Sequence, residues 1–196
     1  MLWLFTGDSI TQGAAHIGEA RSYPQLFEEW IRYQMGRSHD FVVNTAISGN
    51  FAEDLLAGYD ERVARFRPDA VAVMLGTNDA VRGASGLSTY REALAAIVGR
   101  VTREGARAIV LTPPGVTADA TTRAPHVAAY AQAARDVAAQ NKATLVDIFD
   151  AWSEGDDGEV PAAWMDDAFH PNARGHREIA RLLIAHIGET FVKGLH

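Results

Sequence analysis

A serine near the start of the chain stands where a nucleophile could lie. The apolar run 2–5 is followed by Thr6, Gly7, Asp8 and Ser9. An apolar run that breaks at a glycine predicts a buried strand ending in a tight turn, with Ser9 lifted off the carboxyl edge of a sheet. Ligand sites of open α/β sheets lie at that edge. The same residues also suit an ordinary loop that turns and caps a helix.

A histidine near the other end of the chain offers the base that a serine nucleophile needs. A serine hydroxyl is a weak nucleophile until a base takes its proton as it attacks. His170 follows Asp167 by three residues, so one turn can present both side chains, and the carboxylate would fix the ring tautomer. Pro171 disfavours helix at His170 and predicts an extended segment there. Asp166 and Asp157 are rival partners for His170.

Alternating strand-like and helix-like segments must position these residues. Apolar runs predict strands at 2–6, 41–43, 70–75, 108–111 and 144–148. Helical patterns lie at 23–35, 51–66, 89–103 and 124–140, and a last helix runs from about Asn172 to Ile187. Right-handed crossovers place such helices on both faces of a parallel sheet. We therefore expect an α/β fold, a three-layer α/β/α sandwich with a five-stranded parallel sheet, as one domain over 1–196.

Gly49 and Asn78 follow the second and third predicted strands and so belong to the same edge as Ser9. A glycine leaves room for close approach, and an asparagine donates hydrogen bonds without bringing a charge. Both residue types are also common in turns and at helix caps, which is the structural alternative for each.

Four short blocks, taken in order, resemble the GDSL or SGNH hydrolase family, which is named for a serine, a glycine, an asparagine and a histidine. The blocks are GDSI at 7–10, Gly49, GTND at 76–79 and DAFHPN at 167–172. Each block is weak alone, whereas the ordered set spans nearly the whole chain and is specific. One departure is Ala46, where the family often carries glycine, and it predicts a slightly stiffer loop.

The resemblance implies a flavodoxin-like SGNH hydrolase fold and a serine esterase that forms an acyl-enzyme on Ser9. It implies a Ser9–His170–Asp167 triad and an oxyanion hole made by the backbone N–H groups of Ser9 and Gly49 and by the Asn78 amide. The expected substrates are small carboxylic esters with short acyl or acetyl groups, including acetylated carbohydrate. Lysophospholipase, thioesterase and acyltransferase activity on the same site are the alternatives.

The composition of the chain argues against several other classes of function. The chain has 196 residues, a formal charge of −7 and no cysteine, and it lacks a cluster of Lys and Arg. These features argue against nucleic acid, stable membrane association and thiolate chemistry. No apolar run approaches the length of a membrane span. A cytoplasmic location is expected, with secretion as the alternative if a leader is missing, and no cofactor is expected.

Two other mechanisms compete with the hydrolase hypothesis. The loop 6–9 could cradle phosphate at a helix N-terminus in a binding module, but Asp8 would repel the anion and the loop has no Lys or Arg. A metal hydrolase would need a His/carboxylate cluster beyond Asp167 and His170, and none is spaced for it in the sequence.

Residues around the predicted site carry weaker signals. Trp152, Trp164 and Phe169 flank the acidic run 154–159, which is typical of a solvated loop pinned by aromatics, with a substrate wall as the alternative. The segment 113–125 predicts a second rim. Asp8 and Asp79 are expected to brace loops. Surface or packing positions are expected for the six other histidines, His16, His39, His126, His176, His186 and His196.

Overall fold

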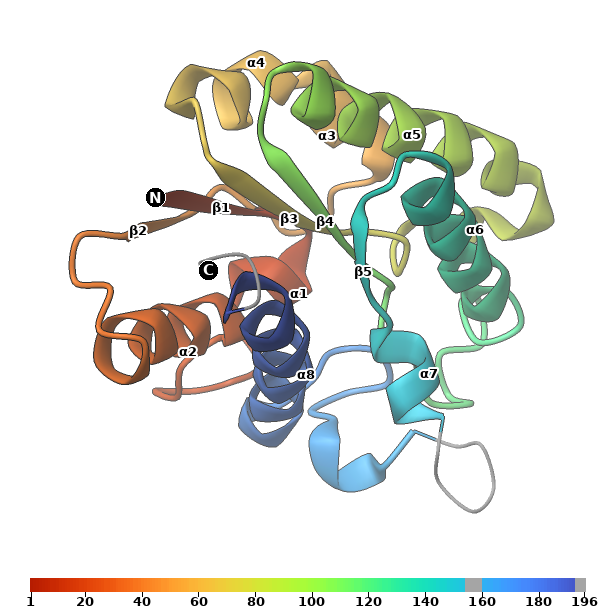
Figure 1. Cartoon of the computed structure of the whole chain (residues 1–196). Helices are drawn as coiled ribbons and strands as arrows, with labels where there is room; N and C mark the ends of the chain where they lie inside the picture. Colours follow the sequence, from red (N-terminus) through yellow and green to blue (C-terminus); the bar gives the residue numbers. More distant parts are fainter. Residues whose placement is uncertain (154–159, 193–196) are drawn as a thin grey trace.

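A five-stranded parallel sheet forms the centre of the structure, a computed structural model that describes residues 1–153 and 160–192 (Figure 1). The strands are β1 (Leu2–Gly7), β2 (Phe41–Asn44), β3 (Ala70–Met74), β4 (Arg107–Leu111) and β5 (Thr144–Val146). Their order is β2-β1-β3-β4-β5, and every neighbouring pair is parallel. The predicted α/β fold with five parallel strands is confirmed.

Helices cover both faces of the sheet (Figure 1). One face carries α2 (Tyr23–Glu29), α7 (Ile148–Trp152) and α8 (Ala173–Val192), and the other carries α3 (Ala52–Ala57), α4 (Tyr59–Arg62), α5 (Leu87–Arg103) and α6 (Val127–Gln140). A short helix α1 (Ser9–Gln12) follows β1, and a π-helical turn (Trp30–Gln34) extends α2. Short 3₁₀ segments complete the chain at Ala64–Phe66, Asp79–Gly86 and Ala162–Trp164.

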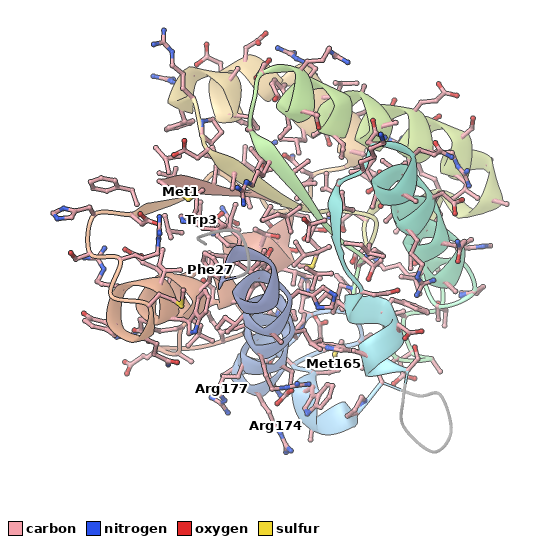
Figure 2. All side chains as sticks on the ribbon, in the orientation of Figure 1. Met1, Trp3, Phe27, Met165, Arg174 and Arg177 are labelled. Carbon is pink, nitrogen blue, oxygen red and sulfur yellow. The ribbon has the colours of Figure 1, made fainter. Side chains whose placement is uncertain are left out.

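The two cores follow from the period-2 alternation of strand side chains. Leu4 of β1 points into the core under α3, α4, α5 and α6, whereas Trp3 and Phe5 point into the core under α2 and α8. Trp3 meets Phe27 of α2 edge to face, with ring centroids 5.1 Å apart, and both lie between the sheet and α2 (Figure 2). Burial on both faces explains why the central strands are almost wholly apolar.

The chain adds β2 on one side of β1 and then adds β3, β4 and β5 on the other side. The site lies at the point between β1 and β3 where the direction of strand addition changes. The chain leaves β1, passes α2 on one face and returns through β2, then passes α3 and α4 on the other face to reach β3. The loops after β1 and β3 therefore start at neighbouring places on the carboxyl edge and lead to opposite faces of the sheet, which is where open α/β sheets generally bind their ligands. Ser9 lies in the first loop and Asn78 in the second.

Several predicted elements differ in extent from the structure; the last helix, for example, runs to Val192 rather than Ile187. Three of the differences have a local cause. The helix expected over 51–66 is interrupted at Gly58, where the backbone leaves helical geometry with φ −93° and ψ 13°. The helix expected from residue 124 begins at Val127, because 121–126 forms turns that include Pro125. The strand expected over 144–148 ends at Val146, since Asp147 caps α7 by accepting a hydrogen bond from the N–H of Asp150.

Asn172 begins the last helix as predicted. Its side-chain oxygen accepts hydrogen bonds from the N–H groups of Arg174 and Gly175 at 2.8 and 3.2 Å. These bonds satisfy two of the donors that a helix start leaves unpaired. The cap thereby fixes where the chain leaves the segment that carries His170 and enters α8.

Gly7 is the position at which a side chain would separate β1 from β3. A Cβ atom there would lie 2.2 Å from the carbonyl oxygen of Met74. We expect Gly7→Ala to lower the free energy of unfolding by more than Gly18→Ala, measured by urea denaturation. Both glycines have a positive φ, +155° at Gly7 and +59° at Gly18, but open space surrounds Gly18. Gly18→Ala therefore measures only the cost of a positive φ in a residue with a side chain, about 1–2 kcal/mol. Equal losses would show that the close approach at Gly7 does not matter.

Candidate active site

Ser9 is the first residue of α1, directly after the turn that ends β1. Asp8 caps this helix with an extended backbone, and its Oδ1 atom accepts a hydrogen bond from the N–H of Ile10 at 3.0 Å. Gly13 ends the helix in the left-handed conformation. This single turn holds the Ser9 hydroxyl at the carboxyl edge of the sheet, between the strands at which the order reverses.

His170 reaches Ser9 from the segment that precedes α8. The Oγ atom of Ser9 lies 3.0 Å from Nε2 of His170, and Nδ1 of His170 lies 2.8 Å from Oδ2 of Asp167. An antiparallel bridge between Met165 and Pro171 closes the segment into a loop. The structure thus brings together a hydroxyl, an imidazole and a carboxylate in the order that a serine nucleophile requires.

The Asp167 carboxylate holds both the ring and the backbone of this loop. Its Oδ1 atom accepts hydrogen bonds from the N–H groups of Phe169 and His170 at 2.9 and 2.7 Å. Burial raises the pKa of the Asp167 carboxyl, but the hydrogen bond from the His170 ring and these two backbone hydrogen bonds outweigh it. The pKa of Asp167 is therefore lower than its usual value. Asp167 is therefore an anion that orients His170 with Nδ1 as the donor and Nε2 free to accept from Ser9.

Gly49 follows β2 and Asn78 follows β3, the two neighbours of the strand that leads to Ser9. Gly49 adopts a φ of +80°, which favours glycine, and open space surrounds the position of a Cβ atom there. The Nδ2 atom of Asn78 donates to the carbonyl oxygen of Asn50 at 3.2 Å, which ties the two loops together. In the described residues the N–H groups of Ser9 and Gly49 donate to no backbone carbonyl.

Ala46, where related sequences often carry glycine, needs no unusual backbone. Position 46 is not among the residues with positive φ, and its N–H donates to Oδ1 of Asn44 at 3.0 Å. The N–H of Ile47 donates to the carbonyl oxygen of Gly7 at 3.1 Å. The loop that carries Gly49 is therefore fixed by hydrogen bonds that an alanine at 46 leaves intact.

Two buried carboxyl groups adjoin the candidate residues and brace the loops, as predicted. Asp8 caps α1, and Oδ1 of Asp79 accepts a hydrogen bond from the N–H of Ala52 at 3.0 Å. Burial raises the pKa of Asp8 to about 7, opposed by the N–H of Ile10, and raises the pKa of Asp79 to about 6. Oδ2 of Asp79 is buried without a hydrogen-bond partner among the described residues. Both environments favour the neutral acid.

His16 joins the site, which corrects its assignment to the surface and packing histidines. Its ring stacks on the ring of His170, with centroids 3.8 Å apart and planes inclined by 9°. Its Nδ1 atom lies 2.8 Å from Oδ2 of Asp166, so this rival partner of His170 bonds to a different ring. No local pattern indicated the contact, because residue 16 approaches residue 170 only in the tertiary structure.

The same histidine corrects the expectation that no further metal-ligand cluster exists. His16, Asp167 and His170 each place one ligand atom within 4.8 Å of the others. The Asp167 and His170 atoms already share a 2.8 Å hydrogen bond, and the lone pairs of the two stacked rings lie in nearly parallel planes, which do not meet at a common point. A tetrahedral metal needs ligands that converge on one point. The cluster suits an oriented base better than a metal centre.

Of the residues predicted to border the site, one belongs to the hydrophobic core and others lie next to His170. Trp152 is buried and meets Trp164 edge to face at 5.3 Å, so Trp152 belongs to the core rather than to a substrate wall. In the segment 113–125, the N–H of Thr117 donates to the carbonyl oxygen of Ala168 at 2.9 Å, which places this segment beside the block 167–172.

His176 is buried, and its ring accepts a hydrogen bond from the N–H of Tyr23, as expected of a packing residue. The acidic run 154–159, Asp157 included, and His196 lie outside the described residues.

Comparison with known proteins identifies the family. The sequence profile of the GDSL-like Lipase/Acylhydrolase family matches residues 5–178. The chain belongs to this family. An acetylxylan esterase of Geobacillus stearothermophilus is 30% identical over 211 residues, which cover 97% of this chain and 95% of that protein. The predicted resemblance to the GDSL hydrolases is therefore confirmed.

Solved structures of similar proteins agree with this membership. Axe2, an acetylxylan esterase from Geobacillus stearothermophilus, superimposes with a TM-score of 0.82 at 27% identity and covers 95% of this chain and 94% of its own. LAE5, an alpha/beta hydrolase enzyme from the metagenome of Lake Arreo, superimposes with a TM-score of 0.81, also at 27% identity, with the same coverage. The prediction of an enzyme that hydrolyses carboxylic esters is confirmed for this GDSL-like hydrolase.

No helix in 1–153 or 160–192 combines the length and the apolar character that crossing a membrane requires.

Burial of Asp8 predicts that this hydrolase loses stability as the pH rises. A carboxyl group with a raised folded-state pKa stabilises the fold fully below its unfolded value of 3.8, and this contribution is lost as the pH rises through about 7. Asp8→Asn keeps an oxygen for the N–H of Ile10 but cannot ionise. We expect the stability of this variant relative to the wild type to increase between about pH 5 and about pH 8, by about 1.4 kcal/mol per pH unit up to about pH 7 and by little above it.

Urea denaturation of both proteins at the two pH values measures this effect. A stability difference between Asp8→Asn and the wild type that stays constant with pH would show that Asp8 is ionised in the folded protein throughout.

Proposed function

We propose that the chain is a serine esterase that hydrolyses short acyl esters, acetyl esters of carbohydrate in particular, through an acyl-enzyme on Ser9. The observation that carries the proposal is the chain of two hydrogen bonds, 3.0 Å from Ser9 Oγ to His170 Nε2 and 2.8 Å from His170 Nδ1 to Asp167. A hydroxyl, an imidazole and a carboxylate in this order form a proton-transfer system.

In the proposed acylation step, Oγ of Ser9 attacks the ester carbonyl carbon while Nε2 of His170 takes the hydroxyl proton. Collapse of the tetrahedral intermediate breaks the bond to the alcohol oxygen, and His170 returns the proton to the leaving alcohol. Asp167 keeps Nδ1 of the ring protonated and stabilises the imidazolium that forms between these events. Water then attacks the acyl group with His170 again as the base, which releases the acid and restores Ser9.

Negative charge develops on the carbonyl oxygen in both steps. The N–H groups of Ser9 and Gly49 and the second N–H of the Asn78 amide are the proposed donors to it. Asn78 Nδ2 has two hydrogens, and the carbonyl oxygen of Asn50 takes only one of them. Loss of a single donor of this kind costs about 3 kcal/mol in other hydrolases. The positive φ of Gly49 supports its role, because it turns the peptide in a way that other residues rarely adopt.

The substrate class rests on the similar proteins. The name acetylxylan esterase belongs to a protein that this chain matches along nearly its whole length, and to the superimposed structure Axe2. An esterase called TesA from Pseudomonas aeruginosa is 28% identical over 86% of this chain. We therefore favour acetylated sugars over long-chain esters. Lysophospholipids, thioesters and acyl transfer to an alcohol use the same chemistry and are alternatives.

The proposed nucleophile predicts that Ser9→Ala lowers kcat for p-nitrophenyl acetate by at least ~10³-fold, because no other hydroxyl within residues 1–153 and 160–192 is bonded to His170. His170→Ala should do the same, and Asp167→Ala should lose less. Ser88→Ala, which removes an exposed hydroxyl bonded to Glu92 on α5, is the matched control and should keep wild-type activity. A fluorophosphonate reagent should label Ser9, as read by peptide mass spectrometry. Full activity in Ser9→Ala would end the proposal.

The substrate preference predicts a ranking of kcat/KM. We expect acetylated xylo-oligosaccharides and acetyl esters to exceed butyryl and longer p-nitrophenyl esters, a lysophospholipid and an acyl thioester. Product analysis with an added alcohol separates hydrolysis from transfer. A higher kcat/KM for the lysophospholipid or the thioester would replace the substrate class while leaving the Ser9 chemistry in place.

A further inference from the structure

Arg123 lies outside the four sequence blocks of the family, yet it contacts two of them, the blocks 76–79 and 167–172. Its Nε atom donates to the carbonyl oxygen of Thr77 at 3.1 Å, and its Nη2 atom donates to Oδ1 of Asn78 at 3.5 Å. Its Cζ atom lies 3.9 Å from the centre of the Phe169 ring, and that ring lies 4.2 Å from the ring of His170. One guanidinium group therefore contacts the Asn78 loop and the residue next to His170.

The segment that carries Arg123 is itself held in place. At one end, the N–H of Thr117 donates to the carbonyl oxygen of Ala168 at 2.9 Å. At the other, the carbonyl oxygen of Arg123 accepts from the N–H of Val127, the first residue of α6, at 2.9 Å. A side chain anchored by its backbone on both sides can hold a neighbour in one orientation, as positioning residues must.

The Asn78 amide has one end that donates and one that accepts, and its surroundings distinguish them. Its Nδ2 atom faces the carbonyl oxygen of Asn50, which can only accept, and its Oδ1 atom faces Arg123, which can only donate. Turning the amide by half a turn would set two donors against each other at Arg123 and two oxygens against each other at Asn50. Both neighbours thus favour the same orientation of the amide.

We propose that Arg123 is a positioning residue for the oxyanion donor Asn78: its guanidinium holds the amide with the NH₂ group on the Gly49–Asn50 side, where the second hydrogen serves the developing oxyanion. The inference rests on the proposed function. A preorganised donor acts on the transition state rather than on the bound ester, so Arg123 affects kcat and leaves KM nearly unchanged.

A double-mutant cycle on the full chain tests whether Arg123 acts through Asn78. Arg123→Met keeps an unbranched side chain over Phe169 and removes every donor. We expect it to lower kcat for p-nitrophenyl acetate roughly 10-fold, a part of the ~10²–10³-fold that a whole donor supplies in other hydrolases, with KM within about 2-fold. In the Asn78→Ala background, where no amide remains to be oriented, the same change should lower kcat by less than about 2-fold.

Other outcomes overturn the proposal. An equal loss in both backgrounds means that Arg123 acts independently of Asn78, and an unchanged kcat in Arg123→Met means that the amide needs no such support. A raised KM with wild-type kcat means that Arg123 binds substrate instead. If Arg123→Met does not fold, as judged by circular dichroism, Arg123→Leu, which also removes every donor, takes its place in the same cycle with the same outcomes.

Two controls separate this proposal from the proposed function. Arg100→Met removes another guanidinium that lies over an aromatic ring, 4.0 Å from the centre of Tyr59, in the last turn of α5, which leads to the start of β4 rather than to the carboxyl edge, and it should keep wild-type kcat. Labelling of Ser9 by the fluorophosphonate in Arg123→Met shows that the nucleophile is intact. A wild-type protein without esterase activity or labelling would refute the proposed function, whereas an additive cycle in an active enzyme refutes only the role of Arg123.

Discussion

The hydrogen bond between Ser9 and His170 joins two residues that are 161 positions apart in the chain. Its length depends on three structural features: the turn after β1, the place of β1 in the sheet next to the point at which the strand order reverses, and the loop closed between Met165 and Pro171. A shift of about 1 Å in any of them would break the contact, and misplacements of that size are costly in catalysis. The sheet therefore matters to the site chiefly as a rigid frame.

Aspartates fix the loops around this contact in a recurring way. Asp8, Asp79 and Asp167 each accept a hydrogen bond from the backbone N–H of the loop or helix start that they hold. The first two are buried, and burial raises their pKa values to about 7 and about 6, whereas the pKa of Asp167 is lowered. Asp167 therefore stays ionised as the partner of His170 at pH values at which burial favours the neutral form of the two neighbouring acids, which brace the backbone.

The sequence predicted the strands and the last helix well, and the other helices less well. Apolar strand runs and the Asn172 cap are local signals, and β3 and α8 begin where those signals place them. The interruption at Gly58 and the late start of α6 after Pro125 depend on backbone choices that glycine and proline permit but do not force. The end of β5 depends on a cap by Asp147, and a strand pattern alone does not show such a cap.

The sequence by itself determined the family, the fold class and the residues that could do the chemistry, because ordered blocks at strand ends are local patterns with a common edge. Only the tertiary structure decided how those residues meet their neighbours. The stacking of His16 on His170, the pairing of Asp166 with His16 and the reach of Arg123 to Asn78 join segments that are distant along the chain. Such contacts arise from the packing of loops onto the finished sheet, and spacing along one segment carries no record of it.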